Sequence, residues 1–200
     1  MPSVLAGWTI GLAVAWAAVQ VLTFVTSFEA AEVYSRGIDA GGATAVLTAY
    51  DGIGFVFFPI QVATFVVACQ WLFRSRELTA VLQPRERHKR RPVWVWLGWV
   101  VPVVALWFPF QVVRDIRSGT TGLRRTTGLG SWWASWLVMV WASTQAARSS
   151  IGIRPLDPAL MPVLEGVAAV AAVIGVVLWI RIVREITAAQ RARLEMPPGV

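Results

Sequence analysis

The stretch that decides the fold is Pro92 to Val113, PVWVWLGWVVPVVALWFPFQVV. Its 22 residues contain four tryptophans, three prolines and no charged side chain, and 22 apolar residues are enough to cross a membrane as a helix. Pro102 and Pro109 lack backbone N–H groups, so they leave the carbonyls of Gly98 and Ala105 without helical donors. The stretch is therefore either one kinked span or two half-helices joined by a turn.

The composition of the whole chain indicates a membrane protein. Apolar residues make up 56% of the 200 residues and charged residues only 14%, against roughly 25% charged in an ordinary soluble domain. The apolar residues come in long blocks, which is the pattern of transmembrane helices. Besides the broken segment 92–113, spans are predicted at about residues 4–26, 52–73, 131–147 and 162–183. We therefore expect a single, all-α, multi-pass membrane domain covering residues 1–200.

The positive charges favour one arrangement of these blocks. The basic loop 74–91, RSRELTAVLQPRERHKRR, holds seven Lys and Arg, and positive charge in short loops marks the cytoplasmic side. If all five blocks cross, nine positive residues fall on each side of the membrane. If 92–113 enters and leaves on one side, fifteen fall in the cytoplasm and three outside. The sequence thus favours four transmembrane helices plus a Pro-broken re-entrant or half-inserted segment, with five transmembrane helices as the alternative.

Two further connections are predicted to be loops. Residues 28–50 contain three glycines and one arginine, so they are assigned to the outside. Residues 114–130 contain four arginines and the Thr- and Gly-rich run TTGLRRTTGLG, so they are assigned to the cytoplasm. The only histidine, His88, lies in the 74–91 charge run without a carboxylate or cysteine at a ligand spacing. We expect it to be solvated.

Isolated polar and small residues in the apolar blocks predict local contacts. Asp51 can cap the second span, and Glu165 is expected in the first turn of the last span, where the helix dipole favours a carboxylate; a proton relay is the alternative for Glu165. The amide of Gln61 needs a partner, for which Gln20 is a candidate.

Gly7 and Gly11, four residues apart, either admit a neighbouring helix or reflect the abundance of glycine. Trp132, Trp133 and Trp179 are expected at the membrane interfaces.

The central stretch and its flanks resemble a known family. Residues 98–116, GWVVPVVALWFPFQVVRDI, are similar to the two-proline signature of domain of unknown function 4328, a family of bacterial multi-pass membrane proteins. Residues 70–76, QWLFRSR, resemble the family's W-hydrophobic-x-R-(A/S)-R element, and the Ser131-Trp132-Trp133 opening is also similar. The resemblance covers about residues 8–190 and marks the following motif candidates: Trp71, Arg74, Arg76, Gly98, Trp99, Pro102, Leu106, Pro109, Arg114 and Asp115. The chain departs from the signature at Ala105, where the family has Asn, and at Arg117, where it has Trp. The resemblance implies a membrane location and no particular activity.

The sequence predicts a non-enzymatic bacterial membrane protein that binds lipid or a membrane partner through a basic cytoplasmic face. The positive residues expected to contact lipid head groups are Arg85, Arg87, Lys89, Arg90 and Arg91. The expected partners are membrane lipid, anionic lipid in particular, and either a second copy or another membrane protein. No nucleic acid is expected, because the basic loop lacks interleaved aromatic residues.

Two other function classes are weighed against this one. A small transporter or channel component is the alternative, since broken segments often line substrate sites; however, the predicted spans contain almost no ionisable side chain. An enzyme would need a Ser or Cys beside a His, or paired carboxylates in a cleft. Cys69 and one loop histidine do not supply such a set, and a single cysteine excludes an internal disulfide. No cofactor and no metal site are predicted, and the side of the C-terminus and the oligomeric state stay open.

Overall fold

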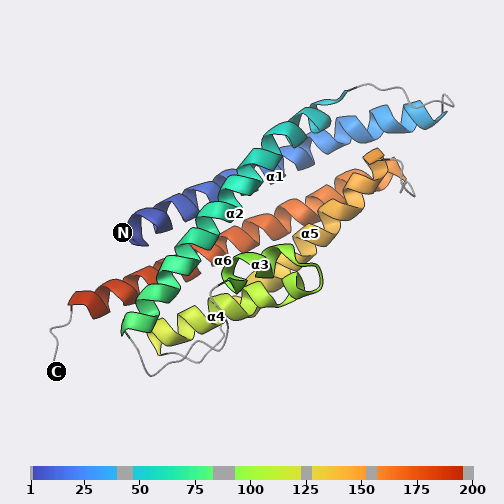
Figure 1. Ribbon diagram of the computed structural model, residues 1–200. Helices are drawn as coiled ribbons and strands as arrows, with labels where there is room; N and C mark the ends of the chain where they lie inside the picture. Colours follow the sequence, from blue (N-terminus) through green and yellow to red (C-terminus); the bar gives the residue numbers. More distant parts are fainter. Residues whose placement is uncertain (1, 40–46, 83–92, 123–127, 152–156, 196–200) are drawn as a thin grey trace. The chain divides into compact units, whose positions relative to one another are not determined.

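The chain folds into helices. A computed structural model describes residues 2–39, 47–82, 93–122, 128–151 and 157–195, and these residues contain no strand. In chain order the elements are α1 (Pro2–Asp39), α2 (Ala49–Leu82), α3 (Trp94–Val100), the 3-10 helix η1 (Val104–Leu106), α4 (Phe108–Thr121), α5 (Leu129–Ile151), the 3-10 helix η2 (Pro158–Leu160) and α6 (Met161–Glu195) (Figure 1). The prediction of an all-α chain is confirmed.

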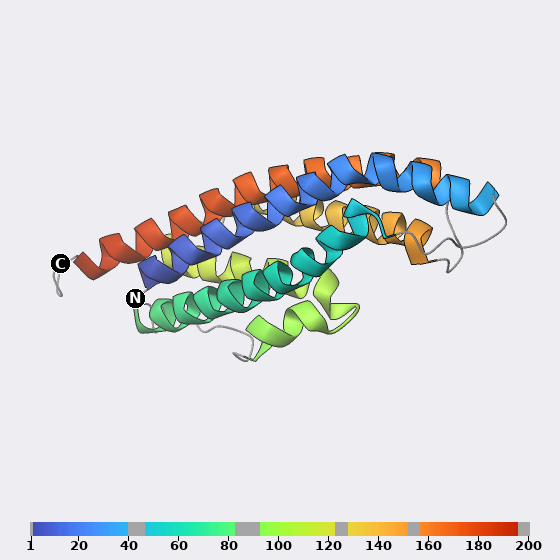
Figure 2. The ribbon, with the colours of Figure 1, turned by 90° about the horizontal axis from the view of Figure 1, so that it is seen from above.

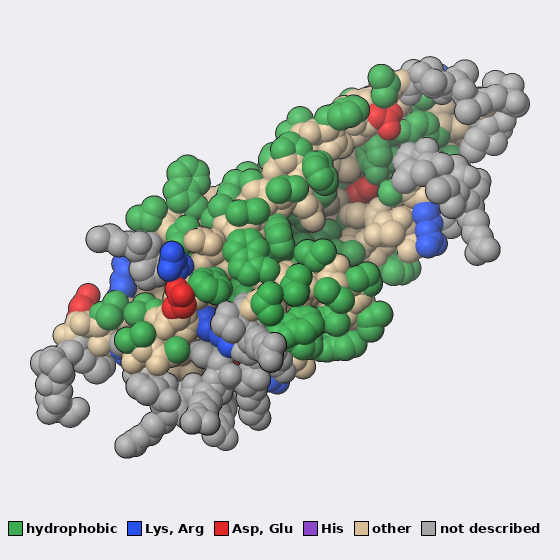
Figure 3. All heavy atoms as spheres, in the orientation of Figure 1, with side chains coloured by type: hydrophobic (Ala, Val, Ile, Leu, Met, Phe, Trp, Pro, Cys, Tyr) green, Lys and Arg blue, Asp and Glu red, His purple; other side chains and the backbone are tan. Residues whose placement is uncertain are grey.

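Among the residues that the structure describes, three helical segments are long and apolar enough to cross a membrane: Ser3–Gly37, Ala49–Val81 and Pro158–Glu195. α5 has 23 residues but is not among them, in keeping with the short apolar block from which it was predicted. Large apolar side chains such as Trp8, Phe55 and Val170 are exposed on these helices, and apolar side chains cover much of the face shown in Figure 3. Exposed apolar surface on this scale is what lipid, rather than water, solvates.

The helices extend well beyond the predicted apolar spans. α1 continues to Asp39, so the first part of the predicted 28–50 loop is helical. α2 includes residues 74–82 of the predicted basic loop, and α4 includes residues 114–121 of the other predicted loop. Hydropathy marks only the apolar part of a helix, whereas Ala, Glu and Arg continue it into polar surroundings because they are strong helix formers. The loop assignments were therefore wrong for residues 28–39, 74–82 and 114–121, whereas residues 40–46, 83–92 and 123–127 lie outside the described residues.

The chain divides into two compact units. Unit 1 comprises Met1–Leu12, Thr64–Trp133 and Val177–Val200, and unit 2 comprises Ala13–Ala63 and Ala134–Val176. The long helices α1, α2, α5 and α6 each contribute residues to both units. In contrast, α3, η1 and α4 belong entirely to unit 1.

Three tryptophans from three helices pack together in unit 1. Trp179 of α6 meets the ring of Trp71 of α2 edge-on, at 5.7 Å between centroids, and stacks on Trp132 of α5 at 5.2 Å. All three side chains are buried, as is Trp133. The three rings pack against one another as aromatic pairs, and the interfacial placement of Trp132, Trp133 and Trp179 stays a prediction.

α4 adds an amphipathic surface to the same unit. Its buried residues recur at helical spacing and are Pro109, Val112, Val113, Ile116, Gly119 and Thr120. This i, i+3, i+4 pattern places one apolar stripe against the unit while the charged residues of α4 lie on other faces. Gly122, in the left-handed conformation with φ of 70°, ends the helix.

Trp16 of α1 is central to the core of unit 2. Its ring stacks on Trp136 at 5.7 Å and contacts Phe57 at 6.0 Å, among small α6 residues that include Ala168 and Ala172. The indole N–H of Trp16 donates to the Gln61 Oε1 atom at 2.8 Å, so Trp16, and not Gln20, is the partner of Gln61. The small residues of α6 are thus packed.

The glycines Gly7 and Gly11 of α1, by contrast, do not mark a close approach of another helix. A Cβ atom built on either residue would meet no atom within 4 Å in the described part of the chain. The interpretation that they admit a neighbouring helix is therefore wrong.

Candidate functional site

The central stretch is a helical hairpin formed by α3, η1 and α4. α3 ends at Val100, and the chain then turns at Pro102–Val103–Val104, where the Val104 N–H donates to the Pro102 carbonyl. Val103 has φ of 54° and ψ of −56°, which is the geometry of a γ-turn that a β-branched residue rarely adopts. The helix break predicted from Pro102 and Pro109 is therefore confirmed.

The chain turns back so that the start of α4 lies on α3 (Figure 2). A Cβ atom built on Gly98 would lie 3.2 Å from the Cβ atom of Phe108, and the rings of Trp94 and Phe108 are 4.7 Å apart. Gly98 is buried, and a side chain at this position would push the two half-helices apart. This contact gives a physical reason for glycine in the family signature.

The turn of the hairpin supplies acceptors for most of its own donors. The N–H groups of Val101, Ala105, Leu106 and Trp107 donate to carbonyls within residues 97–104, at 2.9–3.2 Å. Pro102 has no N–H to satisfy, and the Leu106 carbonyl accepts from the Trp133 indole N–H at 2.7 Å. A non-helical backbone can lie in an apolar medium only when its polar groups are paired in this way.

Neighbouring helices of unit 1 support the hairpin. The Cys69 thiol of α2 lies 3.4 Å from the carbonyl oxygen of Val95, in hydrogen-bonding geometry, and both residues are fully buried. The rings of Phe65 and Trp96 meet edge-on at 6.0 Å, and those of Trp99 and Trp133 do the same at 6.0 Å. α2 and α5 therefore pack on the broken segment, as expected for irregular backbone in a membrane protein.

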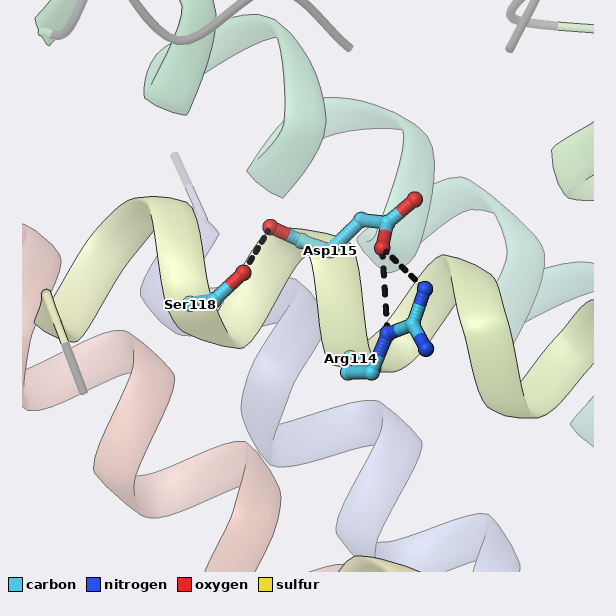
Figure 4. Close-up of polar contacts among 3 residues, drawn as sticks. All are labelled: Arg114, Asp115 and Ser118. Atoms are coloured by element: carbon cyan, nitrogen blue, oxygen red, sulfur yellow. Dashed lines mark hydrogen bonds and ion pairs between the residues drawn. The ribbon is translucent and has the colours of Figure 1, made fainter. Parts of the chain in front are cut away.

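The Arg-Asp pair of the family signature lies on α4, after the hairpin turn (Figure 4). The Arg114 guanidinium donates to the Asp115 Oδ1 atom from Nη2 at 3.1 Å and from Nε at 3.3 Å. The Ser118 hydroxyl donates to the Asp115 backbone carbonyl at 3.2 Å. Both charged side chains are partly exposed, so this pair contributes at most about 1 kcal/mol to stability. Its exposure leaves it accessible to charged groups outside the protein.

Arg117, noted above only as a departure from the family signature, joins α4 to α6. Its guanidinium makes two contacts with Glu185, at 3.0 Å and 2.9 Å. Its side chain is 12% exposed and that of Glu185 is 34% exposed. The hydroxyls of Thr79 on α2 and Thr120 on α4 lie 2.9 Å apart. Polar contacts therefore link α4 to both α2 and α6 within unit 1.

The remaining motif candidates have structural or surface positions. Trp71 is buried in unit 1, and its indole N–H has no partner among the described residues. Arg74 is exposed and pairs with Glu77 at 3.0 Å, while Arg76 is partly buried. Pro109 is buried at the start of α4, and Pro102 and Leu106 are exposed. The predicted lipid-contacting residues of the basic loop (Arg85, Arg87, Lys89, Arg90 and Arg91) lie outside the described residues, as does His88.

The exposed face of α6 changes character along its length. It presents Val170, Ile174 and Val177 first and Arg181, Arg184 and Arg191 afterwards. The three arginines recur at helical spacing on one side of α6 and form no ion pair with any residue that the structure describes. We call them the α6 arginine stripe.

Unit 2 contains a buried polar cluster that the sequence analysis did not predict. Glu165 of α6 is 2% exposed, and its two carboxylate oxygens accept from the Gln20 amide of α1 and from the Tyr50 hydroxyl of α2, both at 2.8 Å. The expectation that Glu165 lies in the first turn of its helix was wrong, because α6 begins at Met161. The polar residue Gln20, buried in an apolar helix, was the available signal for this contact.

Asp51 stabilises the start of α2. The Thr48 N–H donates to the Asp51 Oδ2 atom at 2.9 Å, and the Asp51 N–H approaches the Thr48 Oγ1 atom at 3.4 Å. These reciprocal contacts form a capping box with Thr48 as the N-cap. Asp51 also accepts from the Tyr34 hydroxyl of α1 at 2.8 Å. The prediction that Asp51 is itself the N-cap was wrong, because α2 begins at Ala49, three residues earlier than expected, and Asp51 lies in its first turn, where it bonds back to Thr48.

The proline-broken hairpin, with Gly98 and the Arg114–Asp115 pair, lies in the part of the chain that matches a known family. The family model for a domain of unknown function (DUF4328) matches residues 34–188. The chain belongs to this family. No curated protein and no solved structure matches the chain. Within the described part of the chain, no group of three or more His, Cys, Asp or Glu side chains could hold a metal ion.

Proposed function

We propose that this member of the domain of unknown function 4328 family is a non-enzymatic, multi-pass protein of the bacterial cell membrane. In this proposal it binds anionic phospholipid head groups through an arginine-rich cytoplasmic face. α1, α2, α5 and α6 cross the membrane, and the hairpin enters and leaves it on the cytoplasmic side. The observation that carries the lipid-binding role is the change from aliphatic residues to unpaired arginines along α6.

The geometry of the hairpin supports the four-span topology. α4 packs back on α3, with the rings of Trp94 and Phe108 4.7 Å apart, so residues 94–121 do not form one continuous crossing helix. The hairpin and eight of the ten arginines that the structure describes belong to unit 1, and positive residues gather on the cytoplasmic side of membrane proteins.

The chemistry of the α6 arginine stripe fits a phospholipid. The valines before it match acyl chains, and an arginine can lay its aliphatic stem along such chains while its guanidinium binds a phosphate bidentately. A basic residue near an anionic membrane surface contributes about 1 kcal/mol. Three such residues would therefore favour anionic over zwitterionic lipid by about 3 kcal/mol, or roughly a hundredfold as an upper bound.

Lipid retention tests this proposal. The full chain would be solubilised from vesicles that contain equal amounts of phosphatidylglycerol and phosphatidylcholine, and the retained lipids would be quantified by mass spectrometry. We expect the protein to retain phosphatidylglycerol preferentially. The triple variant Arg181→Gln/Arg184→Gln/Arg191→Gln should lose most of this preference. The double variant Arg36→Gln/Arg148→Gln, which changes the two described arginines of unit 2, should keep it.

An unchanged preference for phosphatidylglycerol in the triple variant would overturn the lipid-binding role. If that variant also lost self-association, the α6 arginine stripe would be assigned to a second copy of the chain. The topology is tested separately with a pair of reporters fused after Val200, one active only in the cytoplasm and one only outside. A C-terminus outside the cytoplasm would contradict four spans with a cytoplasmic N-terminus.

A further inference from the structure

We propose that Glu165 is a proton-binding site within the apolar helices of unit 2, with Tyr50 as its contact to water. This inference concerns other residues than the lipid-binding proposal and does not depend on it. In the step considered, the Glu165 carboxylate accepts a proton from hydronium, which gives a neutral carboxyl group and one water molecule. No electron is transferred and no other bond changes.

The first step of the argument is the environment of the carboxyl group. Glu165 is 2% exposed, and it forms no ion pair with any Lys or Arg that the structure describes. An unpaired carboxylate buried among apolar side chains costs several kcal/mol, and protonation removes that cost. An ionisable side chain at such a position in a membrane-spanning helix is a functional-site hypothesis in its own right.

The second step is the nature of the two partners. Gln20 and Tyr50 are both neutral and can each donate or accept a hydrogen bond, unlike an arginine, which only donates. With the carboxylate ionised, both donate to it, as the 2.8 Å contacts indicate. With the carboxyl group protonated, its O–H can donate to the tyrosine oxygen or to the carbonyl end of the turned amide. Each oxygen of the carboxyl group therefore has a hydrogen-bond partner in both protonation states.

The third step is access from water. Tyr50 is only partly buried, whereas Gln20 is 2% exposed, so Tyr50 is the partner of the carboxyl group that reaches the surface. Tyr34 and Tyr50 pack on the same group of buried residues, Ala30, Ala31, Ala146 and Met161. The other titratable groups beside Tyr50 are Tyr34 of α1 and Asp51 of α2, and α5 contributes the apolar Ala146. We therefore assign proton exchange with water to the Tyr50 side of the carboxyl group.

Infrared difference spectroscopy of the reconstituted full chain, recorded as the pH of the buffer is changed, tests the inference. We expect a carbonyl stretching band from a protonated carboxyl group that is protected from bulk water. It should disappear in Glu165→Gln, which keeps the shape of the neutral acid, and remain in Glu29→Gln, which changes an exposed carboxyl group of α1. In Tyr50→Phe the band should move to higher wavenumber, because one hydrogen bond to the carboxyl group is lost, and its exchange in D2O should slow.

A pH-difference spectrum that is the same in the wild type and Glu165→Gln would overturn the inference. If Glu165→Gln does not fold, an unchanged band position in Tyr50→Phe would overturn it equally. Loss of lipid preference in the variants of the α6 arginine stripe would leave this band unchanged, so the two proposals fail independently.

Discussion

Replacing Gly98 by leucine tests the hairpin directly. A Cβ atom at this position would already lie 3.2 Å from the Cβ atom of Phe108, so the rest of a leucine side chain has no room unless α3 and α4 separate. Forcing extra carbon atoms into a packed contact typically costs about 1–3 kcal/mol. Replacing glycine within a helix gains up to about 1 kcal/mol from helix propensity, and this gain must be separated from the packing cost.

Gly11→Leu is the matched control. Gly11 also lies within a helix of unit 1, and a Cβ atom built on it would meet no atom within 4 Å. Both variants gain helix propensity, so their difference isolates the packing term. We expect Gly98→Leu to be less stable than Gly11→Leu by about 1–3 kcal/mol, which is roughly a 5- to 150-fold change in the unfolding equilibrium constant.

The assay is reversible unfolding of the purified protein in mixed micelles with increasing dodecyl sulfate, followed by helix content and tryptophan fluorescence. Equal stability of the two leucine variants would refute the reasoning. It would mean that α3 does not pack on α4 and that Pro92–Val113 is an extended, kinked helix.

Three further predictions use the same unfolding assay. In a double-mutant cycle, Arg117→Ala and Glu185→Ala should show a coupling free energy of about 1–2 kcal/mol, because Arg117 is mostly buried and such a pair lies between exposed and fully buried ones. The cycle for the exposed pair Arg74 and Glu77 should give no more than about 0.5 kcal/mol. Equal coupling in the two cycles would contradict the α4–α6 contact. Trp133→Phe removes the donor to the Leu106 carbonyl and should destabilise the protein by about 0.6–1.7 kcal/mol. Trp141→Phe, at an exposed position of α5, should leave the stability unchanged. Equal stability of the two variants would mean that the Leu106 carbonyl has another donor. Thr48→Ala removes the N-cap hydroxyl of α2 and should lower the free energy of unfolding by about 1 kcal/mol. Thr26→Ala is the control, because the Thr26 hydroxyl bonds to backbone carbonyls of its own helix. An unchanged stability of Thr48→Ala would show that the capping box does not hold the start of α2.

The sequence allowed the all-α fold and the helix break at 92–113 to be predicted, because both follow from local rules. Long apolar runs form helices in a membrane, and two prolines remove specific backbone hydrogen bonds. It did not allow the helix ends to be predicted, because α1 and α4 continue through residues whose hydropathy resembles that of a loop. The amphipathic spacing from Pro109 to Thr120 was present in the sequence, but the apolar stretch and the Thr- and Gly-rich run on either side concealed it.

The candidate sites show the same limit for contacts between distant residues. Gln20 and Glu165 are 145 positions apart, and nothing local to either residue specifies the other. A carboxylate near the start of a helix has a sufficient local explanation in the helix dipole, so the sequence does not reveal that Glu165 is buried. The sequence likewise does not reveal the partner of Arg117, because Glu185 lies 68 residues away.

The tip of the hairpin combines two properties that together favour a membrane. Its apolar side chains are exposed, with Val103 at 66% and Leu106 at 53%, which is unfavourable in water. Its backbone is non-helical, which is unfavourable in lipid unless the polar groups are paired. The donors of Val101, Val104, Ala105, Leu106 and Trp107 are paired within the turn, Pro102 has no donor, and the Val103 N–H has no partner among the described residues. All but one of the donors at the tip therefore meet the requirement that lipid imposes, whereas the exposed apolar side chains do not meet the one that water imposes. The side chain at Ala105 fits the same account, since a methyl group adds no polar atom where the family signature has Asn.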